Sequence, residues 1–459
     1  MGFDYDITVL GGGPGGYVAA ICAAQEGKKV CLIERANVGG VCLNEGCIPT
    51  KTLIKTASVY HNILHAADFG VEGVNADSIK VSMPKLQKRR QAVIDQLVSG
   101  VKGLLQANKV TLIEANAHFS DIHTVIAGNK TITSEYFIIA TGSTVFIPPF
   151  ITLEGKNNII TSKEALLLEK IPESAIIIGG GVIGIEFAYL LNTLGCKVTV
   201  LELLDNILPM VDEEVSAIAR KRLVKDGVTI HTGAKVGRVK DNNVFYECNG
   251  AERSISADVV LMAVGRVPDT EGLDAQKIGI EFDKKAIIVD EFGRTNVENI
   301  YAIGDVNGKV MLAHTASHEG IAAVENICGG NVKVDYNKIP SCIYIEPEVS
   351  CIGLTEKQAR ELYTDIKVGK FPMVANGKSL TTGDTDGLVK VIVDGNLGEI
   401  LGVHICGNHV TEMISEISLA MSLEATFEEV IATIHPHPTV SEAIPEAFMA
   451  AFGKAIHFK

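Results

Sequence analysis

The stretch "DITVLGGGPGGYVAAICAAQEGKKVCLIE", residues 6–34, decides the fold class. It runs from an apolar strand through the pattern G-x-G-x-x-G into an amphipathic helix, and then into a second apolar strand that ends at Glu34. The first glycine permits a tight turn, the second lets the backbone approach a pyrophosphate, and the third lets the helix pack close to the strand. The stretch therefore predicts a βαβ unit that receives a dinucleotide at the N-terminus of its helix.

The stretch "SAIIIGGGVIGIEFAYLLNTLGCKVTVLE", residues 174–202, repeats this unit. In both copies the final glutamate, Glu34 or Glu202, lies 23 positions after the first glycine. Such a carboxylate can accept hydrogen bonds from a ribose diol. A plain βαβ turn with incidental glycines is the alternative, and two matching copies argue against it. The glycines expected to hold two dinucleotides are Gly11, Gly13 and Gly16 in the first copy and Gly179, Gly181 and Gly184 in the second.

The acid of the second copy also bears on the choice of nucleotide. A 2′-phosphate next to Glu202 would be repelled, so this copy favours NAD over NADP. No arginine pair follows Glu202, because the sequence continues as "ELLDNILP".

Two cysteines lie close together in "GGVCLNEGCIPTK", residues 39–51. Five residues of regular helix rise by about 7.5 Å, whereas a disulfide needs Cα atoms within about 7 Å. Cys42 and Cys47 can therefore be bridged only if the segment is bent, which Gly46 and Pro49 favour. Such a strained disulfide suits redox work. Two separate thiols or half of a metal site are the alternatives, but no matching Cys or His pair is nearby, so we expect no metal.

A dithiol that exchanges with a substrate needs a base to form the thiolate. The stretch "TIHPHPTVSEAIPEAF", residues 433–448, offers His435 and His437, with Glu442 placed to orient an imidazole. The alternative interpretation is two surface histidines in a proline-rich turn.

Length and charge exclude several classes of protein. A chain of 459 residues predicts two to four domains. The net charge of −14 argues against nucleic acid as a partner. The longest apolar run is interrupted by four glycines and Glu186, so no membrane span is expected, and the N-terminus enters a strand pattern without a signal peptide. Eight of the ten cysteines lie in apolar surroundings and are expected to be buried.

Three more strand ends carry glycines, at residues 137–143, 259–270 and 299–306. In the last of these, Asp305 is either a ligand of ribityl or ribose hydroxyls or a turn aspartate. From about residue 340 the pattern changes to a hairpin around "DGN" and then to helical spacing, which predicts a separate α+β domain.

Together these motifs resemble the pyridine nucleotide–disulfide oxidoreductases along essentially the whole chain. The motifs that carry the resemblance include "GGGPGGYVAA", "GGVCLNEGCIPTK", "IIATGS", "IIIGGGVIGIEFA", "AVGRVPDTEGL", "IYAIGDV" and "HPHPTVSE". The resemblance implies an α/β fold with two Rossmann-like dinucleotide-binding domains and a C-terminal α+β dimerisation domain. The expected domains are an FAD-binding domain at 1–148, an NAD-binding domain at 149–267, a central domain completing the FAD site at 268–338 and an interface domain at 339–459.

The resemblance implies that FAD binds the first unit and NAD the second. The residues it assigns to FAD are Gly11, Gly13, Gly16, Glu34, Lys51, Thr141, Gly142, Ser143, Asp305, Met311 and Ala313. The residues it assigns to NAD are Gly179, Gly181, Gly184, Glu202, Val236 and Gly265.

The resemblance also assigns catalytic roles. Cys42 would exchange with the substrate and Cys47 would face the flavin. His437 would be the base and Glu442 its partner. Lys51 and Glu186 would form an ion pair beside the flavin, which explains an acid in so apolar a helix, since a buried carboxylate needs a partner. The implied reaction oxidises protein-bound dihydrolipoamide to lipoamide and reduces NAD to NADH.

The implied partners are a second copy of the chain and a lipoyl-bearing protein of a 2-oxo acid dehydrogenase, acetoin or glycine cleavage complex. The expected location is the bacterial cytoplasm or, if the chain is processed, the mitochondrial matrix. Another disulfide reductase, similar to those for glutathione or mercuric ion, and a non-catalytic flavin-binding subunit are the alternatives. Three departures from the family pattern stand out, Val41, Glu346 and Glu45, and the last should oppose thiolate formation and could shift the redox potential.

Overall fold

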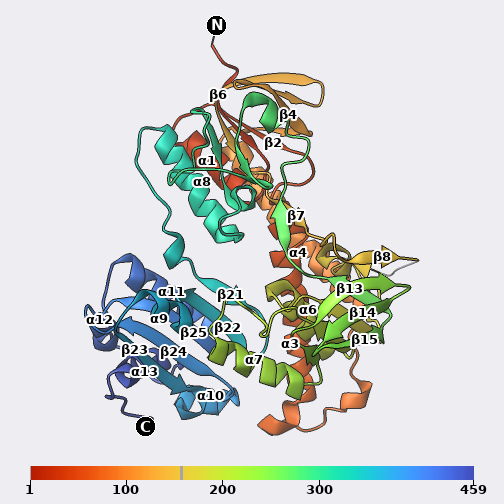
Figure 1. Ribbon diagram of the computed structural model, residues 1–459, viewed down its shortest axis with the longest axis vertical. Coiled ribbons are helices and arrows are strands. Elements are labelled where there is room, and N and C mark those ends of the chain that lie inside the picture. Colours follow the sequence, from red (N-terminus) through yellow and green to blue (C-terminus); the bar gives the residue numbers. More distant parts are fainter. Residues whose placement is uncertain (1, 156–158) are drawn as a thin grey trace. The chain divides into compact units, whose positions relative to one another are not determined.

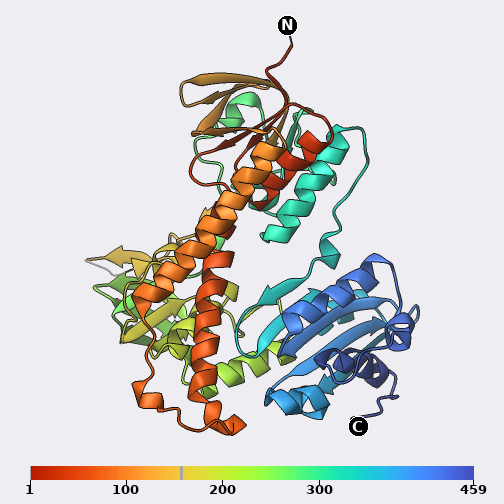
Figure 2. The same ribbon diagram turned by 180° about the vertical axis from the view of Figure 1, so that it is seen from behind.

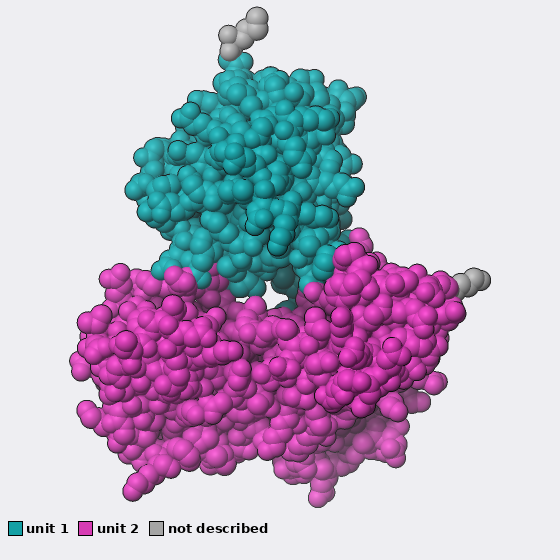
Figure 3. Space-filling model, in the orientation of Figure 1, with its two compact units in different colours: residues 1–52, 84–146, 265–336 teal, residues 53–83, 147–264, 337–459 magenta. Residues whose placement is uncertain are grey.

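The computed structural model describes residues 2–155 and 159–459. The chain folds into two compact units, coloured separately in Figure 3. Unit 1 comprises residues 1–52, 84–146 and 265–336, and unit 2 comprises residues 53–83, 147–264 and 337–459. The four expected domains divide the chain at other positions and stay a prediction.

Unit 1 is built on a sheet whose parallel core has the order β3–β2–β1–β6, with β20 paired to β6 and the antiparallel β5 and β4 extending it. Its central strands are almost wholly buried, as expected for parallel strands covered on both faces. The strands are β1 (Tyr5–Leu10), β2 (Val30–Glu34), β3 (Thr111–Glu114), β4 (Ala117–Asp121), β5 (Thr124–Ala127), β6 (Lys130–Ile139), β7 (Ser143–Val145), β17 (Arg266–Pro268), β18 (Phe282–Asp283), β19 (Ala286–Ile287) and β20 (Ile300–Ala302).

Two helices of unit 1, α1 (Pro14–Gln25) and α8 (Ala313–Ile327), run side by side (Figure 2). Their contact depends on glycine. A Cβ atom on Gly15 would lie 2.9 Å from the Ala316 carbonyl oxygen, and one on Gly320 would lie 2.7 Å from the Gly15 oxygen. Gly15 of the first glycine stretch and Gly320 of α8 therefore let the two helices approach closely. Unit 1 also contains α2 (Gly40–Asn44), the first residues of α3 (Cys47–Leu64) and all of α4 (Met83–Ala107) except Met83.

Unit 2 contains a second parallel sheet of order β12–β11–β10–β16–β9 and a smaller sheet of order β15–β14–β13–β8. Its strands are β8 (Thr152–Glu154), β9 (Ile159–Ile160), β10 (Ser174–Ile178), β11 (Lys197–Leu201), β12 (Thr229–His231), β13 (Lys235–Lys240), β14 (Asn243–Cys248), β15 (Ala251–Ser256) and β16 (Val259–Met262). The helices of this part are α5 (Ser162–Ala165), α6 (Val182–Thr193) and α7 (Glu213–Lys225).

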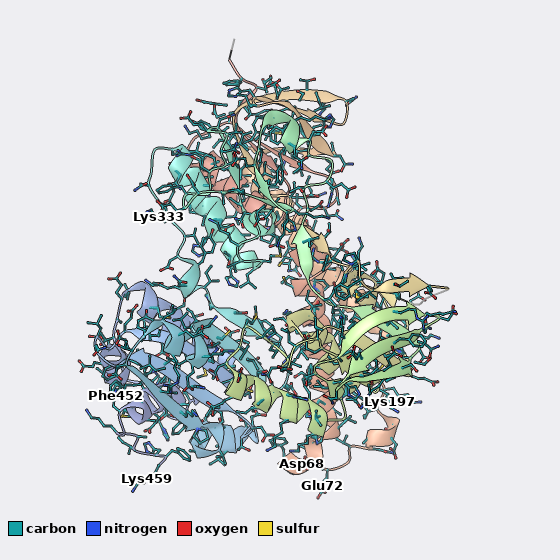
Figure 4. All side chains as sticks on the ribbon, in the orientation of Figure 1. Asp68, Glu72, Lys197, Lys333, Phe452 and Lys459 are labelled. Carbon is teal, nitrogen blue, oxygen red and sulfur yellow. The ribbon has the colours of Figure 1, made fainter. Side chains whose placement is uncertain are left out.

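The C-terminal part of unit 2 is an antiparallel sheet of order β21–β22–β25–β24–β23 with helices packed on it (Figure 1). The predicted hairpin around "DGN" is present as β24 paired with β25. Phe452, labelled in Figure 4, stacks on Phe427 with ring centroids 4.0 Å apart. The elements are β21 (Ser341–Ile343), β22 (Glu348–Gly353), α9 (Glu356–Leu362), β23 (Ile366–Pro372), α10 (Gly377–Thr382), β24 (Leu388–Asp394), β25 (Ile400–Gly407), α11 (Val410–Ser422), α12 (Phe427–Ala432) and α13 (Ala443–Ala451).

Three features of the described residues bear on the expectations from composition. No helix in residues 2–155 and 159–459 is both long and apolar enough to cross a membrane. The same residues contain no group of three His, Cys, Asp or Glu side chains that could hold a metal ion. Five of the eight scattered cysteines are buried, but Cys328 is exposed because it follows the end of α8, so the expectation of burial is wrong there.

Candidate active site

The first glycine loop has the geometry expected of a phosphate cradle. Gly11 has φ +104°, and a Cβ atom there would lie 2.3 Å from the Ala140 carbonyl oxygen. A Cβ atom on Gly16 would lie 1.8 Å from the Gly11 oxygen, so α1 packs directly on the end of β1. By contrast, a Cβ atom on Gly13 would meet nothing closer than Gly40 Cα at 4.0 Å. The open space before Gly13 fits the pyrophosphate of a dinucleotide at the helix N-terminus.

The second glycine loop repeats these contacts almost atom for atom. Gly179 has φ +112°, and a Cβ atom there would lie 2.3 Å from the Ala263 carbonyl oxygen. A Cβ atom on Gly184 would lie 2.0 Å from the Gly179 oxygen, and one on Gly181 would have no neighbour within 4 Å. Both loops therefore fit a pyrophosphate in the same way.

The glutamates that end the two βαβ units are held by their own glycine loops. Glu34 Oε2 accepts a hydrogen bond of 2.6 Å from the Gly12 N–H, and Glu34 Oε1 accepts one of 2.7 Å from the Ala36 N–H. Glu202 accepts in the same way from the Gly180 N–H at 2.5 Å. Both side chains are about nine-tenths buried. Each carboxylate is thus fixed beside its loop and keeps lone pairs that can accept from ribose hydroxyls.

The two thiols of the first unit lie together at a break between helices. Helix α2 ends at Asn44 and α3 begins at Cys47, so the predicted bend is present. The Cys42 thiol hydrogen-bonds to Cys47, and this bond, followed by burial, raises the pKa of Cys42. Pro49 lies in the first turn of α3, where its missing N–H is not needed, and Ile48 before it is helical. The bend therefore lies before Cys47 and not at the residue that Pro49 was expected to unwind.

An arginine that the motifs did not single out lies at the centre of unit 1. Arg266 Nε donates to Ser143 Oγ at 2.7 Å, and Nη2 donates to the Ser143 carbonyl oxygen at 2.6 Å. Ser143 Oγ in turn donates to Asp305 Oδ2 at 2.5 Å. Burial lowers the pKa of Arg266, against the opposing charges of Asp305, Cys47 and Glu45. Arg266 is therefore a cation that interacts electrostatically with Cys47 and with Glu45.

The turn that carries Asp305 is held by a second residue that the motifs missed. Glu319, which is 5% exposed, accepts from the Gly304 N–H at 2.5 Å and from Tyr336 Oη at 2.6 Å. It also accepts from Asn307 Nδ2 at 3.1 Å. The turn that carries Asp305 is therefore fixed by contacts with Glu319 of α8. The signal in the sequence was an acid among the small residues of "HTASHEGIAA".

Five other predicted FAD residues lie on the segments around this cluster. Thr141 Oγ1 donates to the Asp269 carbonyl oxygen at 2.7 Å, and Gly142 has φ +75°. Ala313 is the first residue of α8 and Met311 precedes its N-cap. Lys51 lies on α3 in unit 1.

The remaining predicted residues lie mostly in unit 2. Glu186 is 3% exposed and accepts from the Tyr344 N–H at 3.1 Å. Its ion pair with Lys51 would join the two units and stays a prediction. Val236 lies on β13, pairs with Tyr246 of β14 and is 4% exposed. Gly265, at the start of the last segment of unit 1, has φ +123°.

The two candidate histidines differ sharply in their surroundings. His437 Nδ1 lies 2.9 Å from Glu442 Oε1, and the His437 side chain is 77% exposed. His435 Nε2 lies 2.7 Å from Glu416 Oε1, and its side chain is 6% exposed. Burial acts to raise the pKa of Glu442, but hydrogen bonds from the Thr439 N–H and His437 outweigh it and lower that pKa. Of these two histidines, only His437 has a side chain that is largely exposed to solvent.

Comparison with known proteins identifies the family of this chain. The family model for pyridine nucleotide-disulphide oxidoreductases matches residues 5–320, and the model for the dimerisation domain of the same family matches residues 339–448. The chain belongs to the pyridine nucleotide-disulphide oxidoreductase family. Its match to the family's dimerisation domain supports a homodimer.

Relatives within the pyridine nucleotide-disulphide oxidoreductases cover the whole chain. A dihydrolipoyl dehydrogenase of Bacillus subtilis is 44% identical over 100% of both chains. A mitochondrial dihydrolipoyl dehydrogenase of Schizosaccharomyces pombe is 41% identical over 99% of this chain and 91% of its own. Among solved structures, the HOCl-induced flavoprotein disulfide reductase RclA from Escherichia coli matches with a TM-score of 0.85 at 29% identity, covering 97% of this chain and 99% of that one.

These findings confirm the fold class and the family predicted from the motifs, a flavin-dependent disulfide oxidoreductase that uses FAD and NAD. The roles assigned to single residues stay predictions.

Proposed function

We propose that the chain is a dihydrolipoyl dehydrogenase, which oxidises protein-bound dihydrolipoyl groups and passes the electrons through FAD to NAD. The thiol pair carries this proposal. Cys42 and Cys47 hydrogen-bond to each other in the unit that contains the first glycine loop, and the half-buried Arg266 of the same unit interacts electrostatically with Cys47. Full-length relatives of 41–44% identity bear the name dihydrolipoyl dehydrogenase.

The exchange runs on the chain's own sulfur atoms. In the oxidised enzyme, one substrate thiolate attacks Sγ of Cys42 and breaks the Cys42–Cys47 disulfide, releasing Cys47 as a thiolate. The second substrate thiol then attacks the sulfur of the substrate in the mixed disulfide, which closes the lipoyl disulfide and releases Cys42. His437 accepts the protons that leave the substrate thiols.

Each half of the site contributes charge to this exchange. Arg266 interacts electrostatically with Cys47, and Glu442 orients the His437 ring through the contact of its Oε1 with Nδ1. Bound FAD would supply the two-electron acceptor for the dithiol, and bound NAD would supply the final hydride acceptor. The first loop with Glu34, Ser143 and Asp305 would hold FAD, and the second loop with Glu202 would hold NAD.

The homodimer supplies the base in this proposal. His437 is exposed on the dimerisation domain, so we assign it to the thiol pair of the partner subunit. The lipoyl substrate would be a domain of a 2-oxo acid dehydrogenase, acetoin or glycine cleavage complex. The relatives are bacterial and mitochondrial, which supports the bacterial cytoplasm or the mitochondrial matrix as the compartment.

A parallel steady-state assay tests the proposal. The FAD-loaded enzyme is given dihydrolipoamide with NAD or NADP, and its NADH- and NADPH-dependent reduction of glutathione disulfide and of mercuric ion is measured beside it. We expect kcat/KM to be highest for dihydrolipoamide with NAD, and NAD to be preferred over NADP by at least about tenfold, or ~1.4 kcal/mol. Faster turnover of glutathione disulfide or mercuric ion, or equal use of NADP, would refute it.

A further inference from the structure

A buried lysine in the C-terminal part of unit 2 binds three carboxylates. Lys390, on β24, is 2% exposed. Its Nζ lies 2.8 Å from Asp212 Oδ1, 2.6 Å from Glu214 Oε2 and 2.7 Å from Glu356 Oε2. Burial alone would lower the pKa of Lys390, but the three hydrogen bonds outweigh it and raise that pKa. Removing one partner from such a cluster leaves buried charge unpaired.

Asp212 is held in this cluster through both its side chain and its backbone. Its side chain caps α7 by accepting from the Glu214 N–H at 3.1 Å, and it also accepts from the Glu356 N–H at 3.1 Å. Its own N–H donates to His404 Nδ1 at 3.2 Å. His404 is wholly buried, and burial lowers its pKa, so the ring is neutral and its Nε2 donates to the Leu354 carbonyl oxygen at 3.0 Å.

The segment before Asp212 connects this cluster to the second glycine loop. The Leu208 N–H donates to the Gly180 carbonyl oxygen at 2.9 Å, while the Gly180 N–H donates to Glu202. The same segment is tied to α7, because Ser216 Oγ donates to the Ile207 carbonyl oxygen at 2.6 Å. The peptide groups on both sides of Gly180 are thus fixed by Glu202 and Leu208, and the chain that continues from Leu208 is pinned at Asp212.

We infer that Lys390 is a positioning residue for the nicotinamide nucleotide, because it anchors Asp212 and thereby the segment that holds Gly180 and Glu202 in place. The inference rests on the proposed role of this loop in binding NAD. Lys390 and Asp212 are 178 positions apart in the sequence, but an ion pair joins them directly. One short segment then leads from Asp212 back to the second glycine loop. Loss of Lys390 should let Asp212 turn away from β24, loosen the segment and weaken NAD binding. The thiols and the first loop lie in unit 1 and should be spared.

Lys370 provides a matched control. It also binds Glu214, with its Nζ 2.7 Å from Oε1, but its side chain is 44% exposed and it does not contact Asp212 in the described structure. Surface pairs of this kind contribute little to stability. Lys370→Met therefore removes one charge from the same cluster without releasing the anchor.

The test measures the Kd for NAD by calorimetry on the FAD-loaded dimer, together with the KM for dihydrolipoamide. We expect Lys390→Met to raise the Kd by about tenfold, a loss of ~1.4 kcal/mol, and to leave the KM for dihydrolipoamide within about twofold of wild type. Lys370→Met should change neither quantity. A lower melting temperature with an unchanged Kd would show that Lys390 is only structural and would overturn the inference.

Two further results keep the test decisive. If Lys390→Met does not fold, Asp212→Asn replaces it, since asparagine still caps α7 but binds Lys390 more weakly. We expect Asp212→Asn to raise the Kd by about threefold or more, ~0.7 kcal/mol, and an unchanged Kd overturns the inference. If the wild-type enzyme itself binds no NAD, the proposed function fails first, and the inference fails with it.

Discussion

Arg266 Nε donates a 2.7 Å hydrogen bond to Ser143 Oγ, and through that hydroxyl the guanidinium is joined to Asp305. Ser143 and Asp305 both come from motifs that predict flavin contacts, but neither motif indicates that the half-buried Arg266 holds them. These two hydrogen bonds bring together Ser143, Arg266 and Asp305, which come from three separate parts of the chain.

Replacing Arg266 should weaken FAD binding. Arg266→Met removes two charge-assisted hydrogen bonds to Ser143, and the loss of each buried bond costs about 1–3 kcal/mol. We expect the Kd for FAD, measured by reconstitution of the apoprotein, to rise by at least about tenfold. Arg266→Lys should recover little, because lysine lacks the planar fork. Lys333→Met removes a cation of the same unit that is 52% exposed and pairs with the exposed Glu291, and it serves as the control. Unchanged FAD affinity in Arg266→Met would contradict the assignment.

The two histidines of the C-terminal segment should separate in a kinetic test. His437→Gln removes the exposed imidazole that Glu442 orients, so kcat with dihydrolipoamide should fall by about 10²–10⁴-fold. FAD content should stay normal. His435→Gln removes a covered ring paired with Glu416, and its main effect should be a lower melting temperature. The reverse ranking of the two kcat values would show that the wrong histidine was chosen.

The two cysteines should differ in their spectra although both are required for turnover. Cys42→Ser leaves Cys47 next to the positive charge of Arg266, which favours its thiolate. A thiolate beside oxidised FAD gives a long-wavelength absorption band, so this variant should show the band without any reductant. Cys47→Ser should not show it. Both variants should lose lipoamide turnover, and retained activity in both would exclude this pair as the redox centre.

The buried imidazole of His404 should make the stability of unit 2 depend on pH. Burial, the largest cause, lowers the pKa of His404 in the folded state, so the unfolded chain binds the extra proton first. Stability is therefore fully present above the ordinary histidine pKa, about 6.5, and is lost as the pH falls toward the lowered folded value. We expect the melting temperature to fall between pH 7.5 and pH 5.5 in the wild type, and to fall less in His404→Gln. Equal slopes would mean that His404 is not the group responsible.

Acid should weaken the same region again at lower pH. Burial acts to raise the pKa of Asp212, but hydrogen bonds from Lys390 and backbone N–H groups outweigh it and lower that pKa. A depressed carboxyl pKa contributes stability above the unfolded value, about 3.9, which is lost as the pH falls through the folded value. The loss of stability caused by His404 thus occurs at a higher pH than the loss caused by Asp212. His404→Gln should therefore remove only the loss at the higher pH.

The sequence by itself determined the architecture and the chemistry of this protein. A strand, a helix and a glycine turn are local features, so their periodicity and spacing could be read at residues 6–34 and 174–202 without any knowledge of the rest. Gly11 and Gly179 illustrate the reason, since each needs a positive φ angle and has no room for a Cβ atom. The thiol pair was equally local, although the bend lies before Cys47 and Ile48, next to Pro49, is helical.

Only the tertiary structure decided which charged groups meet. Arg266 and Ser143 are 123 positions apart, and Lys390 and Asp212 are 178 positions apart. Such pairs depend on the order in which strands join a sheet, and a pattern with a period of two or four residues carries no record of that order. Burial has the same dependence: His435 and His437 lie two positions apart in one proline-rich turn, yet one is covered and the other exposed. Packing against Glu416 makes that difference, because a contact between distant segments removes one ring from water and leaves the other in it.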